Sequence, residues 1–369
     1  MVSKVTVVGT GLIGASIGLA AASRGASVAG WDPDPEALSV AEERGAVAAA
    51  GSLEEALSGA EVAVVAAPIA VLPAQVAAVL AAAAEETTVT DVGSTKASVV
   101  AAAGDSPRFV GGHPISGAES HGPANASAGL FEGATWFLTP TAQTDHERHR
   151  VVHGFVAELG AFPVAIDPAA HDRLLALTSH LPHVLANVIV NQAGATRIEG
   201  YEPLTSGGGA LRDLTRIAGA NPRIWTDIFL DNAAAVREAL GEYRRRLEQV
   251  DAALAAGDAG FLARWIGEAG QNRRRMLARA YSDAGALHRL QVHVPDRPGV
   301  FAGIAQALGA ERINIEDFEF EHVSPERGGT MTLLVTGESE ARRAAELLEG
   351  QGYGVVVSAE LDDAGEGAE

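Results

Sequence analysis

The stretch Gly9-Thr10-Gly11-Leu12-Ile13-Gly14 decides the fold of the N-terminal part of the chain. It follows the β-branched run Val2–Val8, which predicts a strand, and it opens the apolar run Leu12–Arg24, which predicts a helix. In this context a G-x-G-x-x-G run is typical of dinucleotide binding.

Each residue of this loop has an expected role. Gly9 permits the tight turn, Gly11 removes a side chain that would block a pyrophosphate, and Gly14 lets helix and strand pack closely. The helix N-terminus at Leu12 and Ile13 then attracts the pyrophosphate charge.

Asp32 supports this interpretation, because it ends the second predicted strand, Ser27–Trp31, 18 residues after Gly14. A carboxylate there accepts hydrogen bonds from the adenosine ribose and repels a 2′-phosphate, which favours NAD over NADP. Two alternatives stay open. The glycines and Asp32 could form only a turn and a cap, and Arg44 could approach a 2′-phosphate.

The N-terminal half of the chain alternates short strands with Ala-rich helices. A helix is expected over Pro35–Arg44, capped by Asp34. Further strands are expected at Val62–Ala66, Thr87–Asp91, Arg108–Gly112, Thr135–Leu138 and Phe162–Ile166. The pattern predicts the α/β class, with a parallel sheet covered on both faces in a Rossmann dinucleotide-binding domain over residues 1–167.

Two further domains are expected. Long helical stretches at Ala169–Gly194, Pro222–Gly257 and Ala259–Ala284 predict an all-α substrate and dimerisation domain over residues 168–285, and therefore a homodimer. Residues 287–361 read strand-helix-strand-strand-helix-strand, a βαββαβ unit. Residues 362–369 are expected to be an acidic tail.

Composition excludes several classes of function. The formal net charge of −20 disfavours nucleic acid and membrane surfaces as partners. The absence of Cys rules out disulfides, thiolate catalysis and Cys-based zinc sites. No signal peptide and no uninterrupted apolar run of bilayer length are recognised, so a cytoplasmic protein is expected.

Two motifs lie at carboxyl ends of predicted strands, where ligands of open α/β sheets bind. In DVGSTK (91–96), Ser94 and Lys96 are expected to face the cofactor cleft, although Ser94 and Thr95 could serve only as helix caps. In GGHPISGAE (111–119), the two glycines are expected to let the backbone approach a ligand. His113 could then accept a hydroxyl proton during hydride transfer, or hydrogen-bond in a surface turn.

The helical region supplies two more clusters. His180, His183 and Asn187 share one helix face, which predicts a lined cleft or a set of satisfied core histidines, and Pro182 should disturb the helix. A metal site is disfavoured, since no carboxylate set accompanies the histidines. Arg212 and Arg216, four residues apart, suit a substrate carboxylate or a solvated face equally.

Together GTGLIG, DVGSTK, GGHPISGAE, SHLPH and LRDLTRIAGANPRIW resemble the prephenate/arogenate dehydrogenase family over residues 3 to 285. The resemblance implies oxidative decarboxylation of prephenate by NAD to 4-hydroxyphenylpyruvate in tyrosine biosynthesis. It implies that His113 is the catalytic histidine and that Ser94 contacts the same hydroxyl and the nicotinamide. The substrate-binding residues that it implies are His180, His183, Arg216, Glu119, Asp213 and Trp225.

Residues 287 to 360, with DRPGVFAGIAQAL and INI, resemble an ACT regulatory domain. The resemblance implies feedback by tyrosine or another aromatic amino acid, bound near Pro298, Gly299 and Asn314. A purely structural or dimerising domain is the alternative.

Other readings remain. The sequence does not distinguish prephenate from arogenate, and it fixes neither the effector nor its sign. A hydroxyacid dehydrogenase or imine reductase is disfavoured, because such enzymes use a Lys in the helical domain and residues 97 to 369 contain none. A non-enzymatic sensor of NAD and an amino acid is disfavoured by the intact His113 and Arg216.

Overall fold

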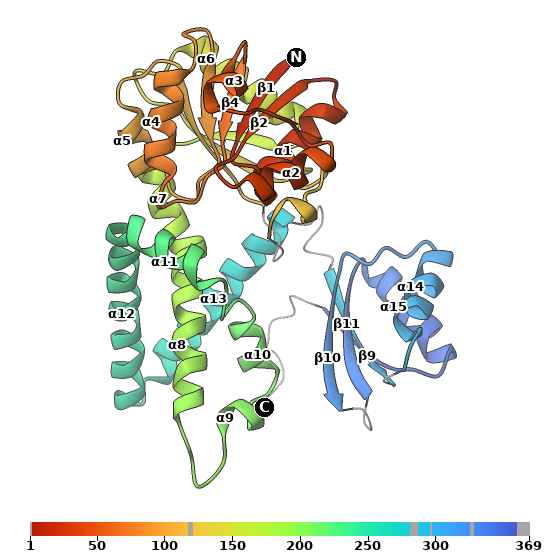
Figure 1. Ribbon diagram of the computed structural model, residues 1–369. Helices are drawn as coiled ribbons and strands as arrows, with labels where there is room; N and C mark the ends of the chain where they lie inside the picture. The colour runs from red at the N-terminus through yellow and green to blue at the C-terminus, as the bar shows by residue number, and fades with distance from the viewer. Residues whose placement is uncertain (1, 117–120, 281–286, 296, 325–327, 360–369) are drawn as a thin grey trace. The chain divides into compact units, whose positions relative to one another are not determined.

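The computed structural model describes residues 2–116, 121–280, 287–295, 297–324 and 328–359 (Figure 1). The chain divides into two compact units, Met1–Arg245 and Arg246–Glu369, and each is described by itself. The predicted tail, 362–369, lies outside the described residues.

The N-terminal unit is built on an eight-stranded sheet in the order β3-β2-β1-β4-β5-β6-β7-β8. The strands are β1 (Lys4–Val8), β2 (Ser27–Trp31), β3 (Ala48–Ala49), β4 (Val62–Val65), β5 (Thr88–Asp91), β6 (Phe109–Pro114), β7 (Thr135–Thr139) and β8 (Phe162–Ala165). The helices between them are α1 (Leu12–Ser23), α2 (Pro35–Glu43), α3 (Leu53–Leu57), α4 (Leu72–Ala82), α5 (Ala97–Ala103), the 3₁₀ turn η1 (Pro123–Asn125) and α6 (His146–Glu158).

Alternate residues of the central strands enter different cores, because successive strand side chains point to opposite faces. Val5 and Val7 of β1 pack in one core with α1 and α6. Val8 of the same strand packs in the other core with α4 and α5. In Figure 1 the strands accordingly lie between α1 and α2 on one side and α4 and α5 on the other. The predicted α/β class with both faces covered is confirmed.

The prediction that the sheet is wholly parallel is wrong at one pair. β6 and β7 run antiparallel, with Gly111 opposite Thr139 and Pro114 opposite Trp136. Parallel neighbours need a long crossover, usually an α-helix. In the described part of the β6–β7 connection the helical structure is the three-residue η1, so the chain returns in the opposite direction.

The rest of the N-terminal unit is helical. Its elements are α7 (Pro168–Leu175), the π-helical turn η2 (Ala176–His180), α8 (Leu181–Ala195), α9 (Pro203–Ser206), α10 (Gly209–Thr215), α11 (Pro222–Asp231) and the first part of α12 (Ala233–Ala256). The expected disturbance near Pro182 is confirmed as the turn η2, because Pro182 lacks the amide that would continue the α-helical ladder. The helical stretch expected over Pro222–Gly257 consists of two helices, α11 and α12, which break at Asn232.

Within the described residues, the run Pro168–Ala195 is long and apolar enough to cross a membrane by length and hydropathy alone. No run of that kind was expected from the sequence. A core helix passes the same test, and this run carries Asp172 and His180, both buried and hydrogen-bonded to other parts of the N-terminal unit.

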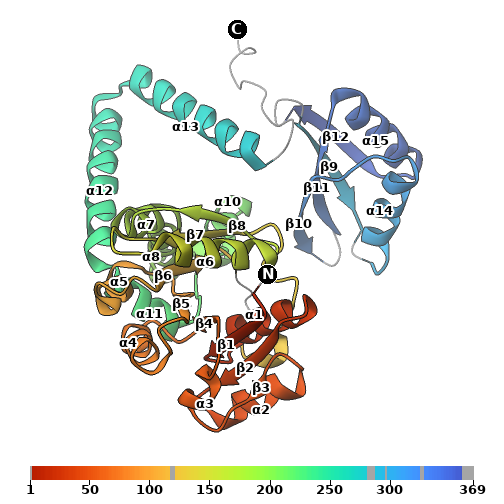
Figure 2. The ribbon, with the colours of Figure 1, turned by 90° about the horizontal axis from the view of Figure 1, so that it is seen from above.

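The C-terminal unit contains the end of α12, α13 (Ala259–Ala280) and a βαββαβ module. The module consists of β9 (Leu287–Val294), α14 (Val300–Ala310), β10 (Asp317–Ser324), β11 (Gly328–Thr336), α15 (Glu338–Gly350) and β12 (Gly354–Ala359). Its antiparallel sheet has the order β10-β11-β9-β12, and α14 and α15 lie on one face of it (Figure 2). The predicted element order is confirmed.

Candidate active site

The glycine loop leaves open space where a phosphate is expected. A Cβ on Gly9, whose φ is +97°, would lie 2.4 Å from the carbonyl oxygen of Ala66. A Cβ on Gly14 would lie 1.9 Å from the carbonyl oxygen of Gly9. A Cβ on Gly11, by contrast, would meet nothing within 4 Å. Gly9 and Gly14 therefore serve packing, and Gly11 keeps the approach to α1 clear.

The N-terminus of α1 fits a pyrophosphate. Gly11 is its N-cap and makes no side-chain cap. The amides of Leu12 and Ile13 belong to the first turn and so have no acceptor within the helix. The loop lies at the carboxyl end of β1, whose neighbours β2 and β4 lie on opposite sides, and such a switch point is where open α/β sheets bind ligands.

Asp32 holds the loop from the end of β2. Its Oδ2 accepts hydrogen bonds from the backbone nitrogen of Thr10 at 2.5 Å and from its hydroxyl at 3.2 Å. Arg44, the suspected partner of a 2′-phosphate, instead donates to the carbonyls of Ala124 and Ala126 at 2.6 and 2.7 Å. Its guanidinium is committed to the η1 segment, which supports the preference for NAD.

Lys96 does not face the cleft as expected. Its side chain is fully buried, and its Nζ pairs with Asp91 and donates to the carbonyl of Gly112 at 2.7 Å. Asp91 Oδ1 also accepts from the backbone nitrogen of Gly112 at 3.0 Å. Burial lowers the pKa of Lys96, and the adjacent Asp91 opposes that shift. The ion pair therefore fixes both backbone groups of the residue that precedes His113.

The two glycines before His113 serve packing and not ligand approach. A Cβ on Gly111 would lie 2.3 Å from the Thr139 hydroxyl, and a Cβ on Gly112 would lie 2.5 Å from the carbonyl oxygen of Asp91. Both positions are buried in β6. The expectation of a close backbone approach to a ligand is therefore wrong for this motif.

His113 lies at the carboxyl end of β6 and begins a chain of hydrogen bonds. Its Nδ1 lies 2.9 Å from Nε2 of His171, and Nδ1 of His171 lies 2.8 Å from Oδ1 of Asp172. All three residues are buried. Burial, followed by the neighbouring His171, Lys96 and His180, lowers the pKa of His113 well below its usual value. The imidazole is therefore neutral at neutral pH.

Asp172 also caps α5. Its two carboxylate oxygens accept from the backbone nitrogens of Lys96 and Ala97 at 2.8 and 2.9 Å. The suggestion that Ser94 and Thr95 cap α5 is wrong. The N-cap of α5 is Lys96, which makes no side-chain cap hydrogen bond, and the side chain that caps the helix is that of Asp172. Ser94 is half-buried at the carboxyl end of β5, and its role toward a ligand stays a prediction.

The predicted histidine face divides into two environments. His180 is buried and its Nδ1 lies 3.1 Å from Nδ2 of Asn232, and burial lowers the pKa of His180 to about 4. His183 is half-buried and stacks on Trp225 with ring centroids 3.6 Å apart. Burial also lowers the pKa of His183. His180 is thus a satisfied core histidine, whereas His183 and Trp225, both predicted for the substrate site, are brought together.

The segment after α10 packs beside His183. The amide of Gly219 donates to Asn187 at 3.3 Å, and the backbone of Ile217 acts against the lowering of the His183 pKa. Arg216, the neighbour of Ile217, is exposed and makes no ion pair with any other described residue. Asp213 is exposed on the same turn. Glu119 lies outside the described residues.

Sequence reasoning missed His171, Asp172 and Asn232 as site residues. Asn232 donates to the backbone carbonyl of Asp172 at 2.8 Å as well as contacting His180. A local signal existed, because a His-Asp pair in an apolar helix must find polar partners when it is buried. Which partners it finds depends on how the helical segment packs on β6 and α5.

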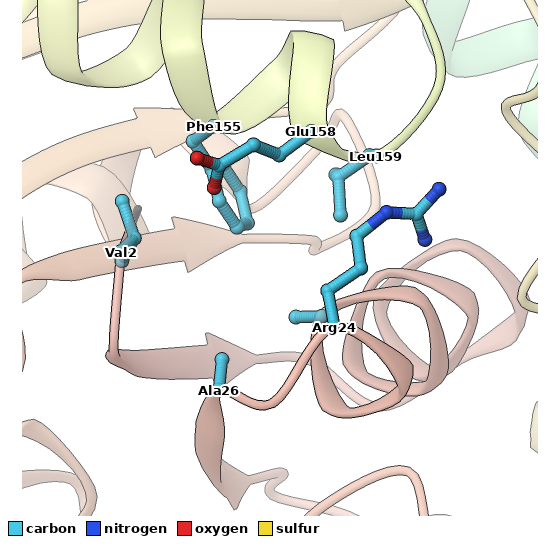
Figure 3. Close-up of a pocket in the computed structure, with 7 residues that line it drawn as sticks. Val2, Arg24, Ala26, Phe155, Glu158 and Leu159 are labelled. Carbon is cyan, nitrogen blue, oxygen red and sulfur yellow. The ribbon is translucent and has the colours of Figure 1, made fainter.

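A pocket at the other end of the sheet does not belong to this site. It lies at the amino ends of β1 and β2, between Val2, Ala26, Arg24, Phe155 and Leu159 (Figure 3). The glycine loop and His113 instead lie at the carboxyl ends of β1 and β6, where cofactor binding is expected.

In the C-terminal unit, the predicted effector residues are at the surface. Pro298 and Gly299 are exposed, and Gly299 caps α14 in the left-handed conformation with a φ of +89°. Asn314 is exposed and donates to Glu316 at 2.9 Å. Effector binding there stays a prediction.

Comparison with known families covers most of the chain. Residues 17–164 match the prephenate dehydrogenase nucleotide-binding domain, residues 167–268 match the prephenate dehydrogenase dimerization domain, and residues 288–352 match the ACT domain. The first match begins after the glycine loop. Among the described residues, no group of three or more His, Asp and Glu side chains is arranged to hold a metal ion.

Individual relatives agree with these matches. The chain is 32% identical to prephenate dehydrogenase of Bacillus subtilis over 270 residues, which are 72% of each chain. It is 27% identical to prephenate dehydrogenase of Lactococcus lactis over 94% of this chain and 97% of the relative.

Two solved structures are similar in fold, each with a TM-score of 0.69. One is prephenate dehydrogenase of A. aeolicus in complex with hydroxyphenyl propionate and NAD+, at 28% identity over 75% of this chain and 99% of that one. The other is arogenate dehydrogenase of Synechocystis, at 27% identity over 74% and 99%. The matches to both prephenate dehydrogenase domains, with the 32% identity to the Bacillus subtilis enzyme over 72% of each chain, show that the chain belongs to the prephenate dehydrogenase family.

Proposed function

We propose that this protein is an NAD-dependent prephenate dehydrogenase, which converts prephenate to 4-hydroxyphenylpyruvate and carbon dioxide in tyrosine biosynthesis. The observation that carries the proposal is the neutral, buried imidazole of His113. It is held through Nδ1 at the carboxyl end of β6, which leaves Nε2 for a substrate. The relatives and the family match supply the substrate class.

The chemistry needs a hydride acceptor, a proton acceptor and a carboxylate clamp. NAD, when bound at the glycine loop, supplies the hydride acceptor. Nε2 of His113 accepts the proton of the C4 hydroxyl as the carbinol is oxidised. The new carbonyl draws electrons from the bond between C1 and its carboxylate, so carbon dioxide leaves and the ring becomes aromatic. His113 then returns its proton to the phenolate oxygen, so that the protein ends in its starting state.

The remaining predicted residues complete the site in this proposal. Ser94 contacts the same hydroxyl, and the stacked pair His183 and Trp225 lines the substrate cleft. Arg216 binds a substrate carboxylate, because its exposed guanidinium makes no ion pair with a described residue and a planar fork matches that group. Asp213 and Glu119 orient this clamp, and His180 supports it from the core.

The test of the proposal is the absorbance of NADH with prephenate and with arogenate in turn, each with and without tyrosine. Formation of NADH together with carbon dioxide from prephenate is expected. NADH formation from arogenate alone would make the protein an arogenate dehydrogenase, as the Synechocystis neighbour is named. No NADH from either substrate would contradict the proposal and favour a non-enzymatic sensor.

Replacing Asp32 with Ala is expected to raise KM for NAD by about 10- to 100-fold, the range for a lost charged hydrogen bond. It should also reduce the preference for NAD over NADP. The reason is that Asp32 both orients the loop through Thr10 and is placed to bind the ribose. Steady-state kinetics with each cofactor make the measurement.

Asp34→Ala is the matched control for Asp32→Ala. Asp34 caps α2 through the amide of Glu36, so its loss should cost about 1 kcal/mol of stability and leave KM for NAD unchanged. Equal effects of the two variants on KM would remove Asp32 from the cofactor site.

Replacing Arg216 with Ala is expected to raise KM for prephenate by about 10- to 100-fold with a smaller change in kcat, since a charge-assisted bond to a carboxylate is lost. Steady-state kinetics over a range of prephenate concentrations measure both constants. Arg237, exposed on α12, supplies the control Arg237→Ala, which should leave KM unchanged. An unaltered KM in Arg216→Ala would exclude Arg216 from the substrate clamp.

Regulation, assembly and location belong to the same proposal. The C-terminal module binds an aromatic amino acid near Pro298, Gly299 and Asn314, and the NADH assay with and without tyrosine tests this.

The protein is a homodimer through its helical region. Support comes from the family match and from the exposed apolar residues of the second unit, Leu254, Trp265, Ile266 and Met276. Light scattering in solution would measure its mass, and a cytoplasmic location is proposed from the same family relationship.

A further inference from the structure

The hydrogen-bond partners of Asp172 determine the proton positions on two histidines. Asp172 accepts from the amides of Lys96 and Ala97. Burial acts to raise the pKa of Asp172, but the hydrogen bonds from His171, Ala97 and Lys96 outweigh it and lower that pKa. The carboxylate is therefore ionised and can only accept. The Nδ1 of His171, 2.8 Å away, must carry a proton and donate it.

The same reasoning extends to His113. A neutral imidazole with a proton on Nδ1 has a free electron pair on Nε2. In that neutral form the Nε2 of His171 accepts, and its partner at 2.9 Å, Nδ1 of His113, donates. This assignment leaves the electron pair of His113 on Nε2, the nitrogen that has no partner within the described chain.

We propose that Asp172 and a neutral His171 are positioning residues that hold His113 in the tautomer with its proton on Nδ1 and its free electron pair on Nε2. For its catalytic consequence the proposal rests on the proposed function, because the electron pair on Nε2 is the proton acceptor there. When Nε2 takes the substrate proton, the positive charge on His113 is linked through His171 to a buried carboxylate, which stabilises it. The other tautomer would present a proton to the substrate hydroxyl and could not act as a base.

The hydrogen-bonded array of His113, His171 and Asp172 is held in place at both of its ends. Asp172 caps α5, and its own backbone carbonyl accepts from Asn232. His113 follows Gly112, whose backbone groups are bound by Asp91 and Lys96. The ring of Phe137 packs edge-on against His171 with centroids 5.6 Å apart, which closes that side with an apolar group. A small rotation of the His171 imidazole would therefore break its hydrogen bonds to both His113 and Asp172.

The tautomer can be measured without turnover. Nitrogen-15 spectra of the imidazoles of the full-length protein at neutral pH should show His113 protonated on Nδ1, with assignment by the His113→Asn variant. His171→Leu should move His113 toward a mixture of both tautomers or toward protonation on Nε2. His113 protonated on Nε2 in the unaltered protein would overturn the proposal, whatever the activity.

Kinetics test the consequence. His171→Leu should lower kcat by about 10²-fold, the lower range for a general base, with KM for prephenate and NAD unchanged. His171→Gln should lose only about 10-fold, because its amide oxygen can still accept from Nδ1 of His113. His153→Gln on α6, at an exposed histidine, is the control and should be unaffected.

The outcomes separate the proposals. An active unaltered protein whose His171→Leu and His171→Gln variants fold and keep normal kcat would overturn the positioning role. Equal losses in both variants, with a tautomer at His113 that does not change, would show a structural role and also overturn it. If His171→Leu does not fold, the tautomer and kcat of His171→Gln decide. Absence of NADH formation by the unaltered protein would instead refute the proposed function and leave the tautomer measurement standing.

Discussion

Replacing His113 with Asn is expected to lower kcat by about 10²- to 10⁴-fold, the range for a lost general base, with little change in the binding of NAD or substrate. The amide nitrogen of Asn can stand near Nδ1 and still donate to His171, so the array beneath the site is kept. Asn has no atom that replaces the Nε2 of His113 as the proton acceptor. The loss should therefore appear in kcat and in kcat/KM equally, as for an interaction made only in the transition state.

The control for this prediction is His153→Asn at the exposed position on α6. Its kcat should equal that of the unaltered enzyme. Near-normal turnover of His113→Asn, with its stability unchanged, would refute the role of His113 as the base.

Replacing Lys96 with Met is expected to reduce the free energy of unfolding by about 3–5 kcal/mol, the cost of removing one partner of a buried ion pair. Both side chains are fully buried, so Asp91 would keep an uncompensated charge in the core. The carbonyl of Gly112 would also lose its donor, and the backbone that carries His113 would loosen. Denaturant unfolding with linear extrapolation measures the loss.

Lys4, which is exposed on β1, provides the matched substitution Lys4→Met, and its effect should lie within about 0.5 kcal/mol. Adding Asp91→Asn to Lys96→Met should cost less than the sum of the two single changes, because the orphaned charge is removed. A loss below about 1 kcal/mol for Lys96→Met would contradict the view that this pair supports the backbone at His113.

The parts of the site that sequence predicts are those that local spacing determines. The glycine loop and Asp32 lie at fixed distances from two strand ends, so their meeting follows from the strand-helix-strand unit alone. His113 follows a strand in the same sheet, and its place at the carboxyl edge follows equally. The cap at Asp34 needs only its own helix.

The parts that sequence does not predict depend on distant contacts. Lys96 follows its strand as Ser94 does, but it turns inward because Asp91 and the carbonyl of Gly112 offer it a buried pair of acceptors. The glycines before His113 look suited to a ligand, yet Thr139 on the antiparallel neighbour fills the space above Gly111. β7 runs antiparallel to β6 because the described part of the connection between them contains no long crossover helix.

The array behind His113 is the clearest case. His171 and Asp172 are adjacent in the sequence, and their polarity shows only that they need partners. The partners are His113, Lys96 and Ala97, at least 58 residues away along the chain. These hydrogen bonds form only because α7 packs on β6 and α5, and no local sequence pattern specifies how α7 packs.

The most direct test of the account is a crystal structure of the protein with NAD and 4-hydroxyphenylpyruvate bound together. Nε2 of His113 should lie about 3 Å from the phenol oxygen of the product, within hydrogen-bond reach, and that oxygen should lie beside the nicotinamide ring. A phenol oxygen bound far from Nε2, with no closure of the chain able to bring them together, would contradict the account.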